Sequence, residues 1–207
     1  DNATGVAGVL EIAEAFTVLR PAPERSMVFL FVTLEESGLL GSKYYAAHPA
    51  IPLEKTVAVI NLDAMSVIGP SKELVVIGLG NSTLDDVARP FAEAQDRVLM
   101  EESEPQNGYF FRSDHFNFAK AGVPALYAKG GVDHREKGRE YGLAWMTDYT
   151  AVRYHKVGDN YDASWDLRGT MQDLKLLHDV GRTLGGNREW PNYVEGNAFR
   201  KTDQRGQ

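Results

Sequence analysis

Cysteine is absent from this 207-residue chain. Its absence excludes disulfides, thiolate-bound metals and cysteine nucleophiles as sources of stability or chemistry. No apolar run reaches the roughly 18 residues that a membrane span requires. The printed sequence also lacks an export signal with a basic start and an apolar centre. Because it begins with Asp1, we expect an upstream segment to have been removed.

Basic residues are outnumbered by acidic ones. Lys and Arg number 22 against 29 Asp and Glu, which gives a formal net charge of −7. A nucleic-acid partner requires a clustered basic face that neutralises phosphates, so this balance predicts no nucleic-acid binding. The hydrophobic content of 43% and the charged content of 25% are typical of a folded globular chain and exclude a disordered one.

The hydrophobic pattern predicts helices that alternate with strands. Runs rich in β-branched and apolar residues predict strands at 26–34, 56–63, 73–80 and 123–129, and the first is expected to be buried on both faces. Three- and four-residue apolar spacing predicts helices at 4–20, 39–48, 82–98, 113–122 and 170–185. This alternation predicts an α/β fold: a three-layer αβα sandwich around a mainly parallel, mixed sheet.

Acidic residues stand where the predicted strands end. Glu35 and Glu36 follow one strand, Asp63 ends the next, and Asp1 directly precedes the first helix. Ligands of open α/β sheets gather outside the carboxyl ends of the strands, so we expect these carboxylates to meet. The loop YHKVGDNYD supplies His155. One imidazole with several carboxylates suits zinc, cobalt or manganese.

Adjacent glutamates allow a division of labour. One can bind a metal, while its neighbour takes a proton from a water on that metal. Two metals about 3.5–4 Å apart, bridged by a shared carboxylate, would stabilise both the attacking oxygen and the developing oxyanion. The chemistry that this pattern predicts is hydrolysis of an amide or ester.

Five motifs carry a family resemblance. The segments DNATGVAGVLEIAEAF, TLEESGLLGS, INLDAM, RSDHFNFAKAGVPAL and YHKVGDNYDASWD resemble, in that order, motifs of the M28 zinc aminopeptidases. The resemblance implies an exopeptidase that removes the N-terminal residue of peptide substrates with two zinc ions. It makes Asp1 the bridging ligand and Glu35 the general base. It also makes Glu36 and His155 ligands of one zinc and Asp63 a ligand of the other.

The resemblance also implies a domain organisation. Residues 1–185 would form the metallopeptidase catalytic domain, and residues 186–207 a polar tail that packs on the surface or is partly disordered. The family site also has a histidine on a strand before the bridging aspartate, so we expect a truncated and inactive site that lacks the first strands. An exposed sheet edge would then favour a homo-oligomer. The motif around Trp190 and Phe199 resembles exported members, which predicts periplasmic or extracellular export.

The residues around the predicted ligands could have either a structural or a functional role. In RSDH, Ser113 or Asp114 would cap a helix, while the resemblance places Asp114 and His115 at the substrate pocket or behind the ligands. The two long connections NGYFFRSDH and GGVDHREKGREYGLAWMTDY are expected to be loops at the cleft rim.

The loop around His155 contains further candidates. Tyr154 would orient a ligand or line the cleft, and Asp159 or Asp162 would accept a hydrogen bond from the histidine. Three other functions stay open: a carboxypeptidase, a glutaminyl-cyclase-like enzyme on the same scaffold, and a non-catalytic binding homologue.

Overall fold

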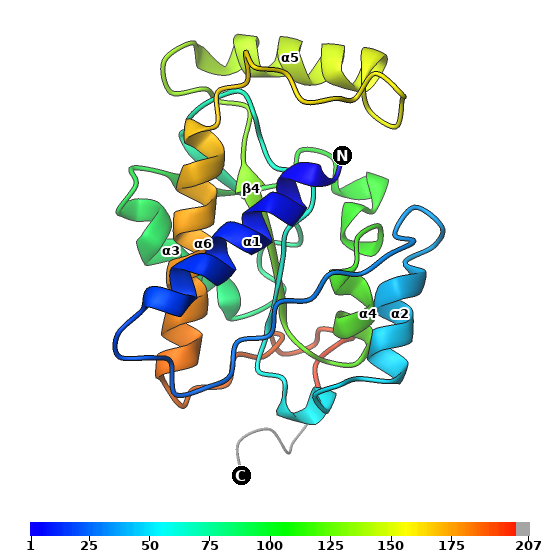
Figure 1. The fold of residues 1–207 in the computed structure, drawn as a ribbon, viewed down its shortest axis with the longest axis vertical. Coiled ribbons are helices and arrows are strands. Elements are labelled where there is room, and N and C mark those ends of the chain that lie inside the picture. Colours follow the sequence, from blue (N-terminus) through cyan, green and yellow to red (C-terminus); the bar gives the residue numbers. More distant parts are fainter. Residues whose placement is uncertain (202–207) are drawn as a thin grey trace.

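The computed structural model describes residues 1–201 and has a mixed α/β fold (Figure 1). Its helices are α1 (Ala3–Val18), α2 (Leu40–Ala47), α3 (Leu84–Glu93), α4 (His115–Lys120), α5 (Gly138–Val152) and α6 (Arg168–Gly186). Its strands are β1 (Val59–Asn61), β2 (Glu73–Val76), β3 (Val98–Glu101) and β4 (Ala125–Gly130). Three short 3₁₀ helices cover Leu53–Lys55, Pro105–Asn107 and Tyr109–Phe111.

The four strands form one mixed sheet in the order β1-β4-β2-β3. The β1–β4 pair is parallel, with Ile60 opposite Leu126, and the β2–β3 pair is also parallel. The central pair, β2 and β4, is antiparallel, with Leu74 opposite Gly130. The predicted mixed sheet is therefore confirmed.

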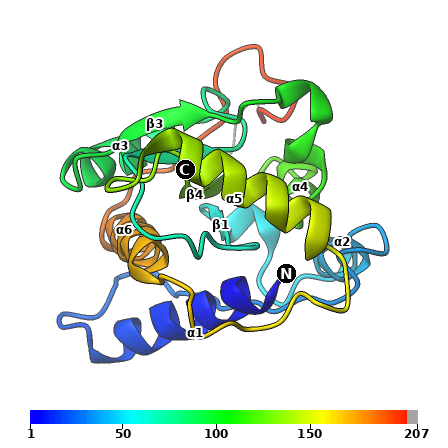
Figure 2. The same cartoon turned by 90° about the horizontal axis from the view of Figure 1, so that it is seen from above.

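Helices cover both faces of this sheet (Figure 2). On one face α3 and α6 contact β4, and α1 packs against α6. On the other face α4 contacts β1 and β4, and α2 packs against α4. The central apolar layer includes Leu74, Leu126 and Leu176, each at most 1% exposed. Full burial of such a side chain stabilises the fold by roughly 1.5–3 kcal/mol.

The strand predicted at residues 26–34 is wrong. The segment is extended, but no strand pairs with it among residues 1–201. Without a partner on either side, its apolar side chains are only partly covered: Val28 is 55% exposed and Phe31 48%. The segment has a high strand propensity, but a strand forms only where a neighbouring strand can hydrogen-bond to it.

Two elements differ from the predicted secondary structure. The loop expected between Gly130 and Tyr149 contains the 15-residue helix α5, which lies above the sheet in Figure 1. Tyr141, Trp145 and Tyr149 recur in it at four-residue steps, a helical signal that the flanking glycines masked. The helix expected at 82–98 ends at Glu93, and Val98 begins the unpredicted edge strand β3.

The chain after α6 contributes to the core. Tyr193 is fully buried, and its hydroxyl donates to the Val123 carbonyl over 3.1 Å. Phe199 stacks on Phe110 at 5.8 Å between ring centroids. The part of the predicted disordered tail at 202–207 lies outside the described residues. Within residues 1–201, no helix is both long and apolar enough to cross a membrane.

Candidate active site

Close packing between α1 and the end of β1 brings Asp1 to the sheet. A Cβ on Gly5 would lie 2.7 Å from the Asp63 carbonyl oxygen, a distance that only glycine permits without movement. The Thr4 hydroxyl accepts a hydrogen bond from the Met65 amide over 3.0 Å. Thr4 therefore ties the first turn of α1 to the chain after Asp63, whereas no cap bond from the Asn2 side chain is found there.

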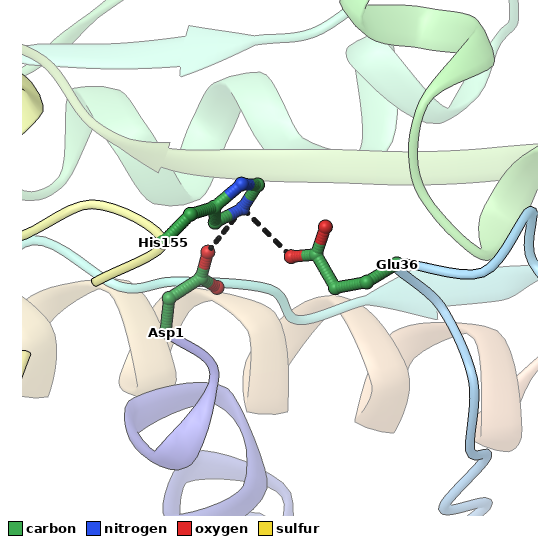
Figure 3. Close-up of side chains that lie close together, drawn as sticks. All are labelled: Asp1, Glu36 and His155. Carbon is green, nitrogen blue, oxygen red and sulfur yellow. Dashed lines mark ion pairs between the residues drawn. The ribbon is translucent and has the colours of Figure 1, made fainter. Parts of the chain in front are cut away.

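Asp1, Glu36 and His155 converge although they lie far apart in sequence (Figure 3). His155 Nε2 is 2.7 Å from Glu36 Oε1 and 3.2 Å from Asp1 Oδ2. Of residues 1–201, only these three form a group of potential metal ligands whose donor atoms all lie within 4.8 Å of one another. Two carboxylates and an imidazole match the donors of catalytic zinc sites, which have three protein ligands.

The loop geometry around His155 holds its ring in place. His155 has a left-handed backbone conformation with φ of 56°. The Tyr154 ring stacks on the imidazole with centroids 3.8 Å apart. Asp159 does not contact His155. Its Oδ2 accepts from the Tyr149 hydroxyl over 3.1 Å and pairs with the Asp1 amino group over 2.6 Å.

Asp162 also does not contact the imidazole. Its Oδ1 accepts hydrogen bonds from the Ser164 amide and hydroxyl at 2.9 and 2.8 Å, and its Oδ2 lies 3.7 Å from Arg153. The predicted bond from His155 to either aspartate is therefore not formed. Asp159 instead joins the loop to Tyr149 on α5 and to Asp1, and Asp162 fixes the turn at Ser164.

Glu35 lies in a different electrostatic environment from Glu36. Burial, followed in order of effect by the charges of Asp63, Glu36 and Asp114, raises the pKa of Glu35 to about 7. A carboxylate with a pKa near neutrality is suited to exchange protons at physiological pH. The doublet thus combines one carboxylate against the imidazole with one that is partly desolvated.

A tight turn presents the two glutamates. Leu34 and Leu39 on either side have φ of 59° and 60°, and Gly38 has φ of 95°. The Glu35 carbonyl accepts from the amides of Gly38 and Leu39 over 3.0 and 2.8 Å. Left-handed non-glycine residues cost roughly 1–2 kcal/mol each, so the turn stores strain at the point where both carboxylates leave the chain.

Asp63 is held by a buried polar chain. Its Oδ2 accepts from the Ser113 hydroxyl over 2.6 Å, and the Ser113 oxygen accepts from the Asn61 amide over 2.9 Å. Its Oδ1 accepts from the following Ala64 amide over 2.7 Å. Asp63 is outside the three-residue group described above, although its charge acts on Glu35.

Asp114 and His115 lie beside this chain. Burial raises the pKa of Asp114, which the Ser42 hydroxyl opposes by hydrogen bonding. His115 is fully buried, with its ring edge-on to Phe110 at 4.8 Å. Burial lowers the pKa of His115 to about 4, although the charge of Asp63 acts to raise it. His115 is therefore a neutral packing residue at physiological pH.

Three neighbours of the site were not singled out from the sequence. Burial raises the pKa of Tyr127, near the charges of Asp63 and Glu35. Lys129 donates to the Ala64 carbonyl over 3.2 Å, and burial lowers its pKa. The sequence indicates Ser113 only as a possible helix cap. The position of Tyr127 and Lys129 at the carboxyl end of a buried strand was the available signal.

Solved structures similar to this chain include aminopeptidases. The aminopeptidase from Aneurinibacillus sp. strain AM-1 superposes with a TM-score of 0.66 at 21% identity, covering 98% of this chain and 42% of that one. The LapA aminopeptidase of Legionella pneumophila gives 0.66 at 17% identity, covering 91% of this chain and 46% of that one. At these identities the likeness shows the fold alone.

Curated relatives match by sequence. The chain is 29% identical over 171 residues to the probable leucine aminopeptidase 2 of Aspergillus oryzae (strain ATCC 42149 / RIB 40), covering 77% of this chain and 33% of that protein. It is 30% identical over 135 residues to the leupeptin-inactivating enzyme 1 of Streptomyces exfoliatus, covering 65% and 29%. The chain thus spans about a third of these relatives. A family model, Peptidase family M28, matches residues 1–177. Because that match covers most of the chain and contains every residue of the site described above, the protein belongs to peptidase family M28.

Proposed function

We propose that this peptidase is a zinc-dependent aminopeptidase. The observation that carries the proposal is the meeting of Asp1, Glu36 and His155 beside Glu35, whose pKa is raised to about 7. The donor set fits zinc in type and number. Bound zinc would supply a Lewis acid that polarises the scissile carbonyl and makes the attacking water more acidic.

Glu35 would act as the general base. It is partly buried and beside the proposed ligand Glu36, so it could take one proton from the attacking water. The same proton would then pass to the departing amine, which leaves Glu35 ionised for the next cycle. Its raised pKa favours both transfers near neutral pH.

A second zinc is part of the proposal. Asp1 would bridge the two ions, and Asp63 would bind the second one. Each Asp63 oxygen accepts one hydrogen bond, Oδ1 from the Ala64 amide and Oδ2 from the Ser113 hydroxyl, so each would keep a lone pair for the ion. The metal content of the purified protein, measured by elemental analysis, tests whether one or two ions bind.

The charge of the site favours an N-terminal over a C-terminal substrate end. Glu35, Asp63 and Asp114 act on one another electrostatically, which makes the proposed pocket acidic. An acidic pocket attracts the α-ammonium group of a peptide and repels a C-terminal carboxylate. This supports an aminopeptidase over a carboxypeptidase. The names of the Aspergillus relative and of the solved structures agree with it.

Paired substitutions test the mechanism. Glu35→Gln should reduce hydrolysis of an aminoacyl-p-nitroanilide by about 10²–10⁴-fold while zinc still binds. Glu36→Gln should instead lower the zinc content, and the exposed Glu54→Gln should change neither. Full turnover in the Glu35 variant would remove it as the base, and unchanged zinc in the Glu36 variant would remove it as a ligand. Zinc binding without turnover of any peptide in the unsubstituted protein would favour the binding homologue or the cyclase.

Export and self-association are separate proposals. We propose that the full-length protein is exported, which cell fractionation would test. We also propose that the extended segment at 26–34, with Val28 and Phe31 exposed, pairs with a second copy. Light scattering after size exclusion tests this pairing, and a monomer at all concentrations would contradict it.

A further inference from the structure

A cavity of about 210 Å³ lies under α5, apart from the carboxylate group of the candidate active site. Its walls come from α5, from the loop that follows α5, and from Val67 and Ile68. In Figure 1 α5 and this loop lie one above the other at the top of the molecule. A cavity of about 150 Å³ holds benzene, so this volume fits one aromatic ring with a small substituent.

Three of the nine residues that line the cavity are aromatic. Tyr141 and Trp145 stand one helical turn apart on α5, and Trp165 faces the cavity from the loop. Together with the aliphatic Val67 and Ile68, these side chains offer flat and apolar surfaces. Such walls are typical of small-molecule sites, which place a few polar groups among apolar side chains.

The polar groups of the cavity have hydrogen-bond donors to spare. The carboxylate of Asp166 accepts hydrogen bonds from Arg168 over 2.6–2.9 Å, so its acceptor atoms are already in use. The Trp165 indole N–H is buried and has no hydrogen-bond partner within residues 1–201. Arg153 makes a loose ion pair, 3.7 Å from Asp162, and its charge also acts on Asp159. Spare donors and an occupied acceptor select an anionic group.

A cationic ligand is disfavoured by the same residues. Three aromatic rings can form a cage for a cation. Here the ammonium of Lys137 already lies over the Tyr141 ring, 4.3 Å from its centroid. Arg153 supplies a second positive charge at the wall. A further cation would be repelled by both.

We propose that the cavity under α5 binds an aromatic carboxylate, with the ring between Tyr141, Trp145 and Trp165 and the carboxylate at Arg153. The ligand is either a free aromatic acid or the C-terminal aromatic residue of a peptide, because both present the same ring and carboxylate. Arg153 lies two residues before His155, so an occupied cavity adjoins the loop of the candidate metal site.

A chain of contacts links the cavity to that site. Trp145 stacks on Tyr149 with ring centroids 5.2 Å apart and planes 7° from parallel. The Tyr149 hydroxyl donates to Asp159, which pairs with the Asp1 amino group. Binding does not depend on the proposed peptidase chemistry, so it is measured without substrate turnover.

Intrinsic fluorescence reports the binding directly. Trp145 and Trp165 line the cavity, while the third tryptophan lies beside Arg25 and is removed by Trp190→Phe. In this background N-acetylphenylalanine should change the emission saturably, and calorimetry should give the same Kd. The neutral N-acetylphenylalanine amide should bind at least about tenfold more weakly, because it lacks the charge that Arg153 recognises.

Matched variants locate the site. Arg153→Gln should weaken binding of the acid about tenfold and leave that of the amide nearly unchanged. Lys156→Gln removes a charge from the same loop outside the cavity wall and should leave both unchanged. Trp165→Phe keeps a ring, removes the N–H and should also weaken binding. It is the second variant in case Arg153→Gln does not fold. Equal affinity for acid and amide, or no saturation up to about 5 mM, would overturn the proposal.

Two ligands distinguish the sources. Tighter binding of N-acetylphenylalanine than of 3-phenylpropionate would identify a peptide C-terminus, because only the former carries the acylated amide. Tighter binding of 3-phenylpropionate would identify a free aromatic acid. Binding of both ligands that is weakened in Arg153→Gln supports the proposed cavity site. Failure of the cavity proposal would leave the zinc and turnover results for the proposed function unaffected.

Discussion

The Ser113 hydroxyl donates to Asp63 Oδ2 over 2.6 Å while its oxygen accepts from the Asn61 side chain. Ser113 is 4% exposed, so this chain of polar groups is shielded from water. It fixes one oxygen of Asp63 just beyond the carboxyl end of β1. Groups that orient a metal ligand, as Ser113 would for the proposed ligand Asp63, often affect metal affinity strongly.

Ser113→Ala should lower zinc affinity about 10–100-fold, because Asp63 loses the donor that orients it. Zinc titration followed by elemental analysis measures this change. Thermal unfolding without zinc is measured in parallel, since Asn61 is left unpaired at a cost of about 1–3 kcal/mol. The exposed Ser103→Ala is the matched control. Loss of stability with unchanged zinc affinity would restrict Ser113 to a structural role.

Gly5→Ala should displace the start of α1. The new Cβ would lie 2.7 Å from the Asp63 carbonyl oxygen, which is backbone and cannot rotate away. We expect a loss of about 1–3 kcal/mol in the free energy of unfolding, together with weaker zinc binding through the displaced Asp1. Chemical denaturation and zinc titration measure the two effects.

Gly186→Ala is the control for this prediction. Gly186 ends α6, and an added Cβ there would meet no atom within 4 Å. Alanine is favoured over glycine in helices, so this variant should be as stable as the unsubstituted protein or slightly more so. Equal stability of the two variants would show that α1 can shift at no cost.

The sequence predicted the parts of the fold whose signals are local. The helices at α1, α4 and α6 and the strands β1, β2 and β4 follow from apolar spacing. The segment at 26–34 has the composition of a strand, but pairing depends on distant parts of the chain, and no strand within residues 1–201 pairs with it. Acidic residues at strand ends and the resemblance to M28 motifs indicated Asp1, Glu36 and His155, which the fold brings together. The contacts of Ser113 depend on χ angles and on Asn61, which no periodicity encodes.

His115→Phe should flatten the pH dependence of stability between about pH 4 and 6.5. Burial lowers the pKa of His115 to about 4 from its usual 6.5. In this range the unfolded chain binds a proton on His115 that the folded protein does not, so the folded state loses stability as pH falls and levels off below pH 4. The loss should not exceed about 3 kcal/mol.

Urea unfolding of both proteins at several pH values measures this effect. The variant's midpoint should be nearly equal at pH 7 and should exceed that of the unsubstituted protein at pH 4.5, because phenylalanine fills the aromatic site beside Phe110 without titrating. His48→Phe is the control, since that ring is exposed. Parallel curves for His115→Phe and the unsubstituted protein would show that His115 titrates alike in both states.

Asp173→Ala should destabilise the protein more than any surface ion-pair variant. Asp173 is fully buried on α6, and its two oxygens accept from Arg97 over 2.7 Å and from the Gly130 amide over 2.8 Å. Removal of the carboxylate leaves the guanidinium of Arg97, itself 2% exposed, without its counter-charge. Such a loss costs about 3–5 kcal/mol.

A surface pair on the same helix gives the contrast. Lys175 pairs with Asp179 over 2.8 Å, with the lysine side chain 71% exposed, and Lys175→Gln should cost at most about 0.5 kcal/mol. Denaturant unfolding compares the two variants at one pH. A similar small loss in both would mean that Arg97 reaches water once Asp173 is gone. A large loss in Asp173→Ala alone would show that the buried contacts of Asp173, which join α6 to Arg97 before β3 and to Gly130 of β4, stabilise the fold far more than an exposed pair does.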